Sequence, residues 1–443
     1  MNKGLALRIS LLIVINIWSF SRVFANGSLT WDGDSLGLNP DSTESKTGFL
    51  LQLSSQHFLM GNALNVDFFK TFVQGGSWNL DKNQRVLNNL SFSNRSFFQS
   101  KSEFSFTELR PLDNEGFHLN WRFQVGDQQY GHARFSGDLF RLVFNGNTNY
   151  LGDTLRIGQN ELERQRFRYF GIGLASANAL DYCMLSYVDG IDFYRMRWNQ
   201  GSFYTSAWGD SIAVDANLHQ LSNASDRKGV GFKLDARKSY VGNKYSLILD
   251  VFDLGWVKWN DLEKEQWNIH ETYSGVQWID WIKVSDPLGQ NIDRWTTAQR
   301  SGVSKWMALP TSIRMQGAWQ VIKNWTLDYS FQRWIYQNQQ GYRCVSIQRK
   351  WQRYSLTRPD LLWRMSGYQS LTRQYWVGSD FGWSWFNGMS VHLQTYQLLS
   401  PMVKASKQFG FGISLQYLFK GSSKTPISIP KEDQKNEQQY FQF

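Results

Sequence analysis

The sequence has few cysteines, and after its first 25 residues it has no apolar run long enough for a membrane-spanning helix. Cys183 and Cys344 are too few and too far apart for a disulfide framework or a cysteine-based metal cluster, and we interpret them as inert strand residues. A spanning helix needs about 20 apolar residues, and the run at 245–249 is broken within a few residues. If exported, such a chain is soluble, secreted or a β-barrel.

Sequence signatures of catalysis are also lacking. No histidine lies at ligand spacing from another metal-binding residue, and His270-Glu271 opens like a zinc-protease helix without the second histidine. The chain has no Gly-x-Ser-x-Gly elbow and no Walker-type phosphate loop. We therefore predict no enzyme, no catalytic residue, no metal site and no cofactor. A membrane-barrel hydrolase with a site assembled from distant strands stays open as the less favoured alternative.

The first 25 residues have the three parts of a secretory signal. Lys3 and Arg8 give a positive start, an apolar stretch covers 9–18, and residues 23–25 (Val-Phe-Ala) precede a plausible cleavage site after Ala25. The alternative is an uncleaved membrane anchor, but the apolar stretch is short for a span. The prediction is an exported protein with its signal peptide removed.

Charge and aromatic content favour a membrane surface over nucleic acid. Removal of the signal takes three basic residues and lowers the formal net charge from +10 to +7. The remaining basic residues are scattered among aromatic segments, which suits acidic lipid headgroups, and we predict no nucleic-acid partner. The 21 Trp and 19 Tyr suit the two membrane–water boundaries of a barrel.

Apolar and polar residues alternate with a period of two in many segments, which is typical of strands with one apolar face. Clear examples are 117–125, 230–235, 326–332 and 409–417. Asp189-Gly190, Gly242-Asn243 and similar pairs separate such segments as hairpin turns. Another strand is expected near 135–144. Residues 158–166 and 260–304 are expected to form loops, the second with a short helix.

This pattern predicts an all-β fold, a single transmembrane antiparallel barrel of roughly 12–14 strands. A β-sandwich is usually shorter, a propeller needs a repeat of about 40–50 residues that we do not find, and a soluble barrel this wide would have an unfilled interior. We assign 1–25 to the signal peptide, 26–50 to a polar segment in or near the lumen, 51–419 to the barrel and 420–443 to a flexible tail.

Several charged residues fall on the polar faces of these strands. Arg122, Lys233, Asp235 and Asp328 would project into the lumen of a barrel. There they would either tune selectivity or neutralise one another, and mutual neutralisation is the favoured interpretation. At the other end of the chain, the outward residues of the last strand are expected to be Phe409, Phe411, Ile413, Leu415, Tyr417 and Phe419.

The segment 253–259 (Asp-Leu-Gly-Trp-Val-Lys-Trp) interrupts the alternation of the strand before it. Continuing the outward register of Tyr245, Leu247, Leu249 and Val251 would point Asp253 at lipid, which is unfavourable at mid-depth. Either the strand leaves the apolar zone there, or a bulge near Gly255 resets the alternation. Trp256 and Trp259 are then expected at the interface. We interpret the motif of Asp253, Gly255, Trp256 and Trp259 as structural.

The same segment resembles the Asp-Leu-Gly-aromatic-aliphatic-x-Trp element of a Bacteroidetes-type family of outer-membrane proteins of unknown function. Residues 144–147 (Phe-Asn-Gly-Asn) and 170–173 (Phe-Gly-Ile-Gly) are similar to that family's glycine-containing segments. The resemblance covers about 61–419. It implies a barrel related in style to fatty-acid transporters and to barrels of the type IX secretion machinery, and no catalytic residue.

Localisation is therefore expected in the cell outer membrane, with outer-membrane lipid as a partner. The expected function is passage or uptake of a small or hydrophobic solute. The alternative is a non-transporting barrel that binds or assembles components of the cell envelope or a secretion system, with a protein partner from that machinery. The sequence does not separate these two classes.

Overall fold

The computed structural model describes residues 48–64, 84, 86–109, 119–176, 181–223, 228–273, 299–335, 341–351, 360–370, 375–385, 389–395 and 408–420. The expected signal peptide, nearly all of the 26–50 segment and the tail after Lys420 lie outside these residues. The barrel begins at Gly48, three residues earlier than expected, and its last strand ends at Lys420.

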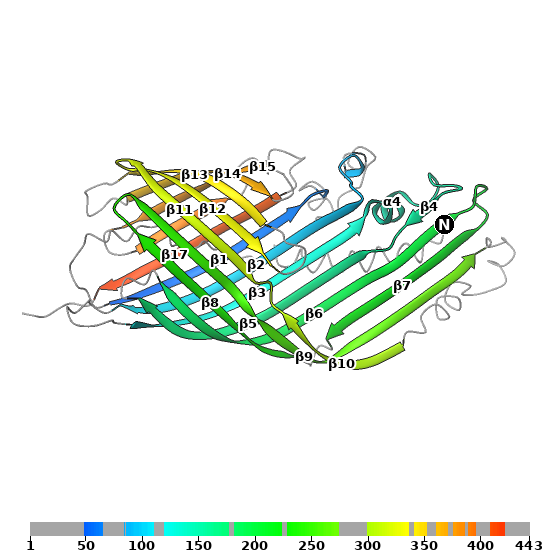
Figure 1. The fold of residues 1–443 in the computed structure, drawn as a ribbon, viewed down its shortest axis with the longest axis horizontal. Coiled ribbons are helices and arrows are strands. Elements are labelled where there is room, and N and C mark those ends of the chain that lie inside the picture. The colour runs from blue at the N-terminus through cyan, green and yellow to red at the C-terminus, as the bar shows by residue number, and fades with distance from the viewer. Residues whose placement is uncertain are drawn as a thin grey trace, which may run out of the picture.

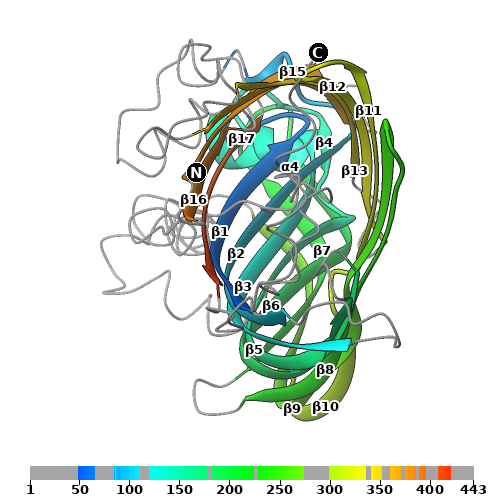
Figure 2. The ribbon, with the colours of Figure 1, turned by 90° about the vertical axis from the view of Figure 1, so that its left-hand side faces the viewer.

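Fourteen of the described strands pair in sequence to form a closed antiparallel ring (Figures 1 and 2). They are β1 (Gly48–Gly61), β2 (Ser93–Leu109), β3 (Leu119–Ser136), β5 (Asn160–Ser176), β6 (Tyr182–Thr205), β8 (Gly229–Val241), β9 (Tyr245–Tyr273), β11 (Ser312–Ile322), β12 (Trp325–Trp334), β13 (Gly341–Trp351), β14 (Asp360–Ser370), β15 (Tyr375–Ser384), β16 (Met389–Thr395) and β17 (Gln408–Lys420). The ring closes where β1 pairs with β17, from Gly48 opposite Lys420 to Met60 opposite Gln408. We call the end of the barrel with Gly48 and Lys420 the terminal end, and the opposite end the distal end.

The wall continues beyond the ring at the distal end. Strands β4 (Thr154–Arg156), β7 (Ile212–Asn223) and β10 (Gln299–Ala308) pair with the distal parts of β6 and β9. These distal parts and the three added strands form what we call the extension sheet, which projects to the right in Figure 1. Helix α4 (Gly137–Asn145) lies at the same end, beside β4.

The two faces of the wall differ in polarity. In β3, Trp121 is 46% exposed on the outer face, while the next residue, Arg122, is 8% exposed on the inner face. Along the other ring strands exposed Phe, Leu, Tyr and Trp likewise alternate with buried Gln, Ser, Asp, Arg and Lys. An apolar outer face around a polar interior is the arrangement of a transmembrane barrel. The chain is therefore a single transmembrane antiparallel β-barrel, as the alternation predicts.

No helix among the described residues is long and apolar enough to cross a membrane. The odd-numbered residues of β17 alternate with the buried Gly410, Gly412 and Ser414, so their side chains point outward as expected.

Three expectations about loops and strands are wrong. Residues 160–166 belong to β5 rather than to a loop, and 260–273 continue β9. Both segments are polar because they lie at the distal end, where β5 meets the extension sheet and β9 runs through it. Residues 137–145 form α4 rather than a strand, because Ser136 caps the helix by accepting a bond from Leu139 N at 3.1 Å. The remaining part of the expected 260–304 loop, 274–298, lies outside the described residues.

Candidate functional site

Strand β9 contains a β-bulge that resets its alternation. Leu234 of β8 pairs with Leu254, but Ala236 pairs with Val251, so Phe252 and Asp253 together stand opposite Asp235. Asp253 has φ = 56°, in the left-handed region. Before the bulge the odd-numbered residues face outward, and after it the even-numbered Leu254 and Trp256 do so. Of the two expected solutions the structure has the bulge, located at Phe252 and Asp253 just before Gly255.

The backbone around the bulge is bonded on both sides. Thr311 Oγ1 donates to the carbonyl of Asp253 at 3.0 Å, and Leu309 N donates to the carbonyl of Gly255 at 2.9 Å. Both partners lie in the short break between β10 and β11. Gly255 itself is packed so closely that an added Cβ would lie 2.0 Å from the carbonyl oxygen of Phe232. Only glycine fits this approach of β8 to β9.

Lys233 occupies the centre of a buried ionic arrangement at the bulge. Its ammonium lies 2.8 Å from Asp235 Oδ2 and 2.8 Å from Asp253 Oδ1, and the lysine side chain is fully buried. Gln124 donates to Asp235 at 2.9 Å, and Gln128 donates to Asp253 at 3.0 Å. Asp235 also accepts a bond from the backbone N of Asp253 at 2.7 Å. The two carboxylates therefore fix both the lysine and the bulge.

The arrangement continues across the inner face as far as β2. Lys233 Nζ lies 3.7 Å from the centre of the Tyr169 ring, and the Tyr169 hydroxyl donates to Glu103 Oε2 at 2.6 Å. Glu103 in turn pairs with Lys101 at 3.0 Å. We call Lys101, Glu103, Tyr169, Lys233, Asp235 and Asp253 the ion-pair network. It connects β2, β5, β8 and β9 through the interior.

Tyr169 reaches Glu103 because it crosses a glycine. Glu103, Gly126 and Tyr169 are successive partners on β2, β3 and β5. A Cβ at Gly126 would lie 2.4 Å from the ring of Tyr169. The absence of a side chain on β3 therefore gives the ring its path across the strand.

Two further ionic groups lie on the inner face. Asp250 accepts from the Nε atoms of both Arg237 and Arg314, the latter at 2.7 Å. On the opposite wall, Arg364 lies 3.4 Å from Asp328 and 3.5 Å from Asp380. In the first group two arginines share one carboxylate, and in the second one arginine is shared by two carboxylates. Opposite charges are therefore paired with one another within the wall.

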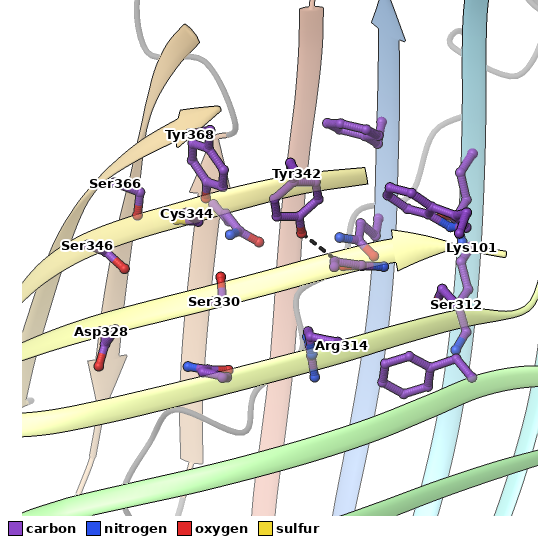
Figure 3. Close-up of a pocket in the computed structure, with 18 of the residues that line it drawn as sticks. Lys101, Ser312, Arg314, Asp328, Ser330, Tyr342, Cys344, Ser346, Ser366 and Tyr368 are labelled. Atoms are coloured by element: carbon purple, nitrogen blue, oxygen red, sulfur yellow. Dashed lines mark hydrogen bonds between the residues drawn. The ribbon is translucent and has the colours of Figure 1, made fainter. Parts of the chain in front are cut away.

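A cavity of about 110 Å³ lies between the ion-pair network and the opposite wall (Figure 3). Its lining is largely polar and includes Lys101, Asp253, Arg314, Asp328 and Arg364, with Gln56, Gln99, Gln316, Gln332 and Gln394 and with Ser312, Ser330, Ser346 and Ser366. Figure 3 shows Ser330, Ser346 and Ser366 on three successive strands, β12 to β14. The cavity is therefore built from both halves of the wall.

Aromatic side chains form one boundary of the cavity. Phe58, Trp334, Tyr342 and Tyr368 line it. Tyr368 stacks on Trp376 with ring centres 5.2 Å apart, and Tyr342 packs edge-on against Tyr368. The Tyr342 hydroxyl donates to Gln332 at 2.9 Å, drawn as a dashed line in Figure 3. We call Phe58, Trp334, Tyr342, Tyr368 and Trp376 the aromatic group.

The residues singled out in the sequence have different places in the structure. Arg122, Lys233, Asp235 and Asp328 are all buried on the inner face, the middle two in the ion-pair network. Trp256 is 46% exposed on the outer face, but Trp259 is 1% exposed inside the barrel. The expectation that Trp259 is interfacial is wrong, because the bulge puts it inward, against Gly190 and Gly229.

The sequence reasoning missed Lys101, Glu103 and Tyr169, and also Arg314 and Arg364 at the cavity. Arg314 and Arg364 alternate with outward-facing apolar neighbours, as Arg364 does between Trp363 and Met365, so their inward orientation was detectable. Lys101 and Glu103 lie in a segment that is polar at every position from 99 to 103, and Tyr169 follows the exposed Arg168, so the pattern did not indicate their orientation. The convergence of all five was not detectable, since they come from strands far apart in the chain. Cys183 is exposed and Cys344 is buried beside the cavity, and both are free thiols. The described residues contain no group of three or more His, Cys, Asp or Glu placed to hold a metal ion.

No protein-family model matches the chain, and no curated protein matches it. Among solved structures, it is similar to a FadL homologue of Pseudomonas aeruginosa, at 8% identity over 84% of this chain and 90% of that one, with a TM-score of 0.39. It is also similar to the toluene transporter TodX of P. putida (10% identity, 88% and 92% covered, TM-score 0.35). A third is the translocator domain of the autotransporter NalP from Neisseria meningitidis (8% identity, 84% and 89% covered, TM-score 0.29). Because these TM-scores are low, the function is inferred from the residues of this chain and not from these structures.

Proposed function

We propose that the protein is an outer-membrane barrel that admits a small solute to its internal cavity and passes it across the membrane. The observation that carries this proposal is a cavity inside a closed transmembrane wall, lined by side chains from both halves of that wall. A secretory signal followed by a barrel is the pattern of outer-membrane proteins, and the apolar outer face provides contact with lipid. Recovery of the protein in a soluble periplasmic fraction without detergent contradicts this location.

The size and polarity of the cavity favour a small solute over a hydrophobic one. A cavity of about 150 Å³ holds benzene, so one of about 110 Å³ accepts only a molecule no larger than benzene. Most of its lining side chains are amides, hydroxyls or charged groups, which lose hydrogen bonds to water if an apolar molecule displaces it. Of the two solute classes expected from the sequence, small or hydrophobic, we therefore retain the small solute.

Osmotic swelling of vesicles that contain the purified protein tests passage. We expect a small uncharged solute to enter faster than it enters protein-free vesicles. Ser346 lines the cavity, and the next residue, Val345, points outward to lipid. Ser346→Trp should therefore slow entry at least tenfold, while Val345→Trp should leave it unchanged. Equal entry through wild type and Ser346→Trp would show that passage does not use this cavity.

A second candidate is a binding or assembly role in the cell envelope, in line with the resemblance to secretion-machinery barrels. The observation that favours it is the extension sheet, which projects beyond the ring and carries polar residues. His270, for example, is 74% exposed by its side chain and lies 3.1 Å from Asp215 on β7. A photo-crosslinking residue in place of His270 should capture a discrete protein partner in intact cells. The same residue at outward-facing Leu247 should capture lipid only, and equal adducts from both positions contradict a docking role.

A further inference from the structure

The charges that line the cavity are already matched within the wall. Each lies close to an opposite charge: Lys101 to Glu103 at 3.0 Å, Arg314 to Asp250 at 2.7 Å, Arg364 to Asp328 at 3.4 Å and Asp253 to Lys233 at 2.8 Å. A charged solute that enters must leave its hydration shell, and the charges that it meets are already held by opposite charges of the wall, so they offset little of that loss. The compensated lining therefore disfavours ions of both signs.

The uncharged part of the lining can both donate and accept hydrogen bonds. Apart from the aromatic residues and Cys344, it consists of five glutamine amides and four serine hydroxyls, Gln56, Gln99, Gln316, Gln332, Gln394, Ser312, Ser330, Ser346 and Ser366. Several are direct partners on neighbouring strands, such as Gln316 with Ser330 and Ser346 with Ser366. Directly opposite residues are about 5 Å apart at Cβ. Donors and acceptors placed this close together suit a solute that carries several hydroxyl groups.

The aromatic group offers the complementary surface. Trp334, Tyr342 and Tyr368 line the side of the cavity next to these polar rows. Aromatic rings pack well against C–H groups, and buried Tyr also keeps a polar tip for hydrogen bonding. A molecule with hydroxyls on one side and a carbon skeleton on the other matches both surfaces.

We propose that the solute admitted to this cavity is a neutral polyol of about three carbons. The volume of the cavity, about 110 Å³, is below the roughly 150 Å³ that hold benzene, and glycerol has as many non-hydrogen atoms as benzene. This inference rests on the proposed function and names its substrate class. Longer polyols and sugars exceed the volume of the cavity. The class differs from hydrocarbons, which the polar lining disfavours, and from small ions, which the matched charges disfavour.

The test compares glycerol with ions of similar size in the same vesicles, with the rate in protein-free vesicles subtracted from each. We expect glycerol to enter at least tenfold faster than glycerate, an anion, and glycinamide, a cation. The double variant Gln316→Leu, Ser330→Ala should slow glycerol about tenfold. Gln52→Leu, also buried on the inner face but outside the cavity lining, should not. Heat modifiability on gels checks that each variant is folded.

The outcomes separate the two proposals. If no solute enters faster than in protein-free vesicles, passage fails, and equilibrium dialysis of labelled glycerol against the detergent-purified barrel then tests the ligand class directly. Binding that is lost in the Gln316→Leu, Ser330→Ala variant supports the polyol assignment, and absence of binding to the wild type overturns it. Entry of glycerate or glycinamide at the rate of glycerol also overturns it while leaving passage intact.

Discussion

The ammonium of Lys233 lies 3.7 Å from the centre of the Tyr169 ring, inside a barrel and 2.8 Å from each of two carboxylates. Cation–π contacts become stronger when both partners are out of water. The same ring carries the hydroxyl that bonds Glu103, so one tyrosine joins the lysine on β8 to the acid on β2. A single substitution on one of these strands is therefore expected to disturb the ionic contacts of another strand that is not its neighbour.

Asp253→Asn should destabilise the folded barrel by about 3 kcal/mol, at the lower end for breaking a buried pair, because Lys233 keeps Asp235. Asparagine tolerates left-handed backbone as aspartate does, so the loss reports the charge and not the bulge. The matched control is Asp261→Asn, since Asp261 is exposed on the same strand and also has positive φ, 51°. Urea unfolding in detergent measures both, and equal midpoints contradict the prediction.

Gly126→Ala should break the bond between Tyr169 and Glu103, because the new Cβ would lie 2.4 Å from the Tyr169 ring. A loss of about 1–3 kcal/mol is expected from overpacking. The control Gly302→Ala has no atom within 4 Å of the added Cβ. A double-mutant cycle with Tyr169→Leu should show coupling, since removal of the ring relieves the clash. Additive effects in that cycle would mean that Gly126 does not serve the tyrosine.

Gly255→Val should reduce the yield of heat-modifiable barrel strongly, because a Cβ there would lie 2.0 Å from the carbonyl oxygen of Phe232 and no side-chain rotation relieves a backbone clash. Gly317→Val on the neighbouring strand β11 is the control, since its nearest atom is 4.0 Å away. Wild-type yield for Gly255→Val, measured by the gel shift on heating, is the result that contradicts the close approach of β8 and β9.

Trp256→Ala and Trp259→Ala should differ, although the two residues are three positions apart. Trp259 is buried in an apolar cluster with Phe193, Val257 and Leu262, so its truncation should cost about 3–5 kcal/mol. Trp256 faces outward, and its loss should weaken anchoring without preventing assembly. Unfolding midpoints of the two variants give the comparison. Equal losses of stability would indicate that Trp259 lies at the membrane interface, as first expected.

Truncation after Phe419 should leave membrane insertion intact. It removes one residue of β17, Lys420, whose partner is Gly48 at the edge of the ladder, and keeps the pairs from Phe49–Phe419 onward. The outward aromatic end of the strand also remains. Insertion is measured by protease resistance and heat modifiability of the truncated chain in membranes. If assembly is abolished, the residues after Phe419 contribute to folding.

The sequence predicts the barrel and its two faces well because alternation is a local property. The outward positions of β17 and the need for a bulge near Gly255 both follow from counting every second residue. Trp259 was misplaced for the same reason: a bulge of one residue reverses every later orientation, and its location at Asp253 depends on Asp235 on the neighbouring strand.

The site was less predictable because its residues meet only in the closed wall. Lys233 and Asp235 were recognised as inward residues, but their contacts with Tyr169 and Gln124 depend on which strands are neighbours and in what register. Helix α4 was mistaken for a strand because its apolar residues 142–144 are consecutive and fit either structure. The capping bond from Leu139 N to Ser136 decides between them.

The direct pairing of Gly48 with Lys420 has a consequence for chain topology. Because the two barrel ends meet at one edge, a short linker could join them and the chain could be opened instead at the turn at 242–244, as a circular permutant. Every strand pair of the ring would be kept.

Loop-closure entropy rises only about 0.6 kcal/mol with each doubling of loop length, so closing the ring through the β1–β17 ladder changes the free energy of folding little. It does make the β1–β17 ladder the most non-local contact of the ring, and non-local contacts slow folding. The natural chain order therefore governs when the ring closes more than how firmly it stays closed.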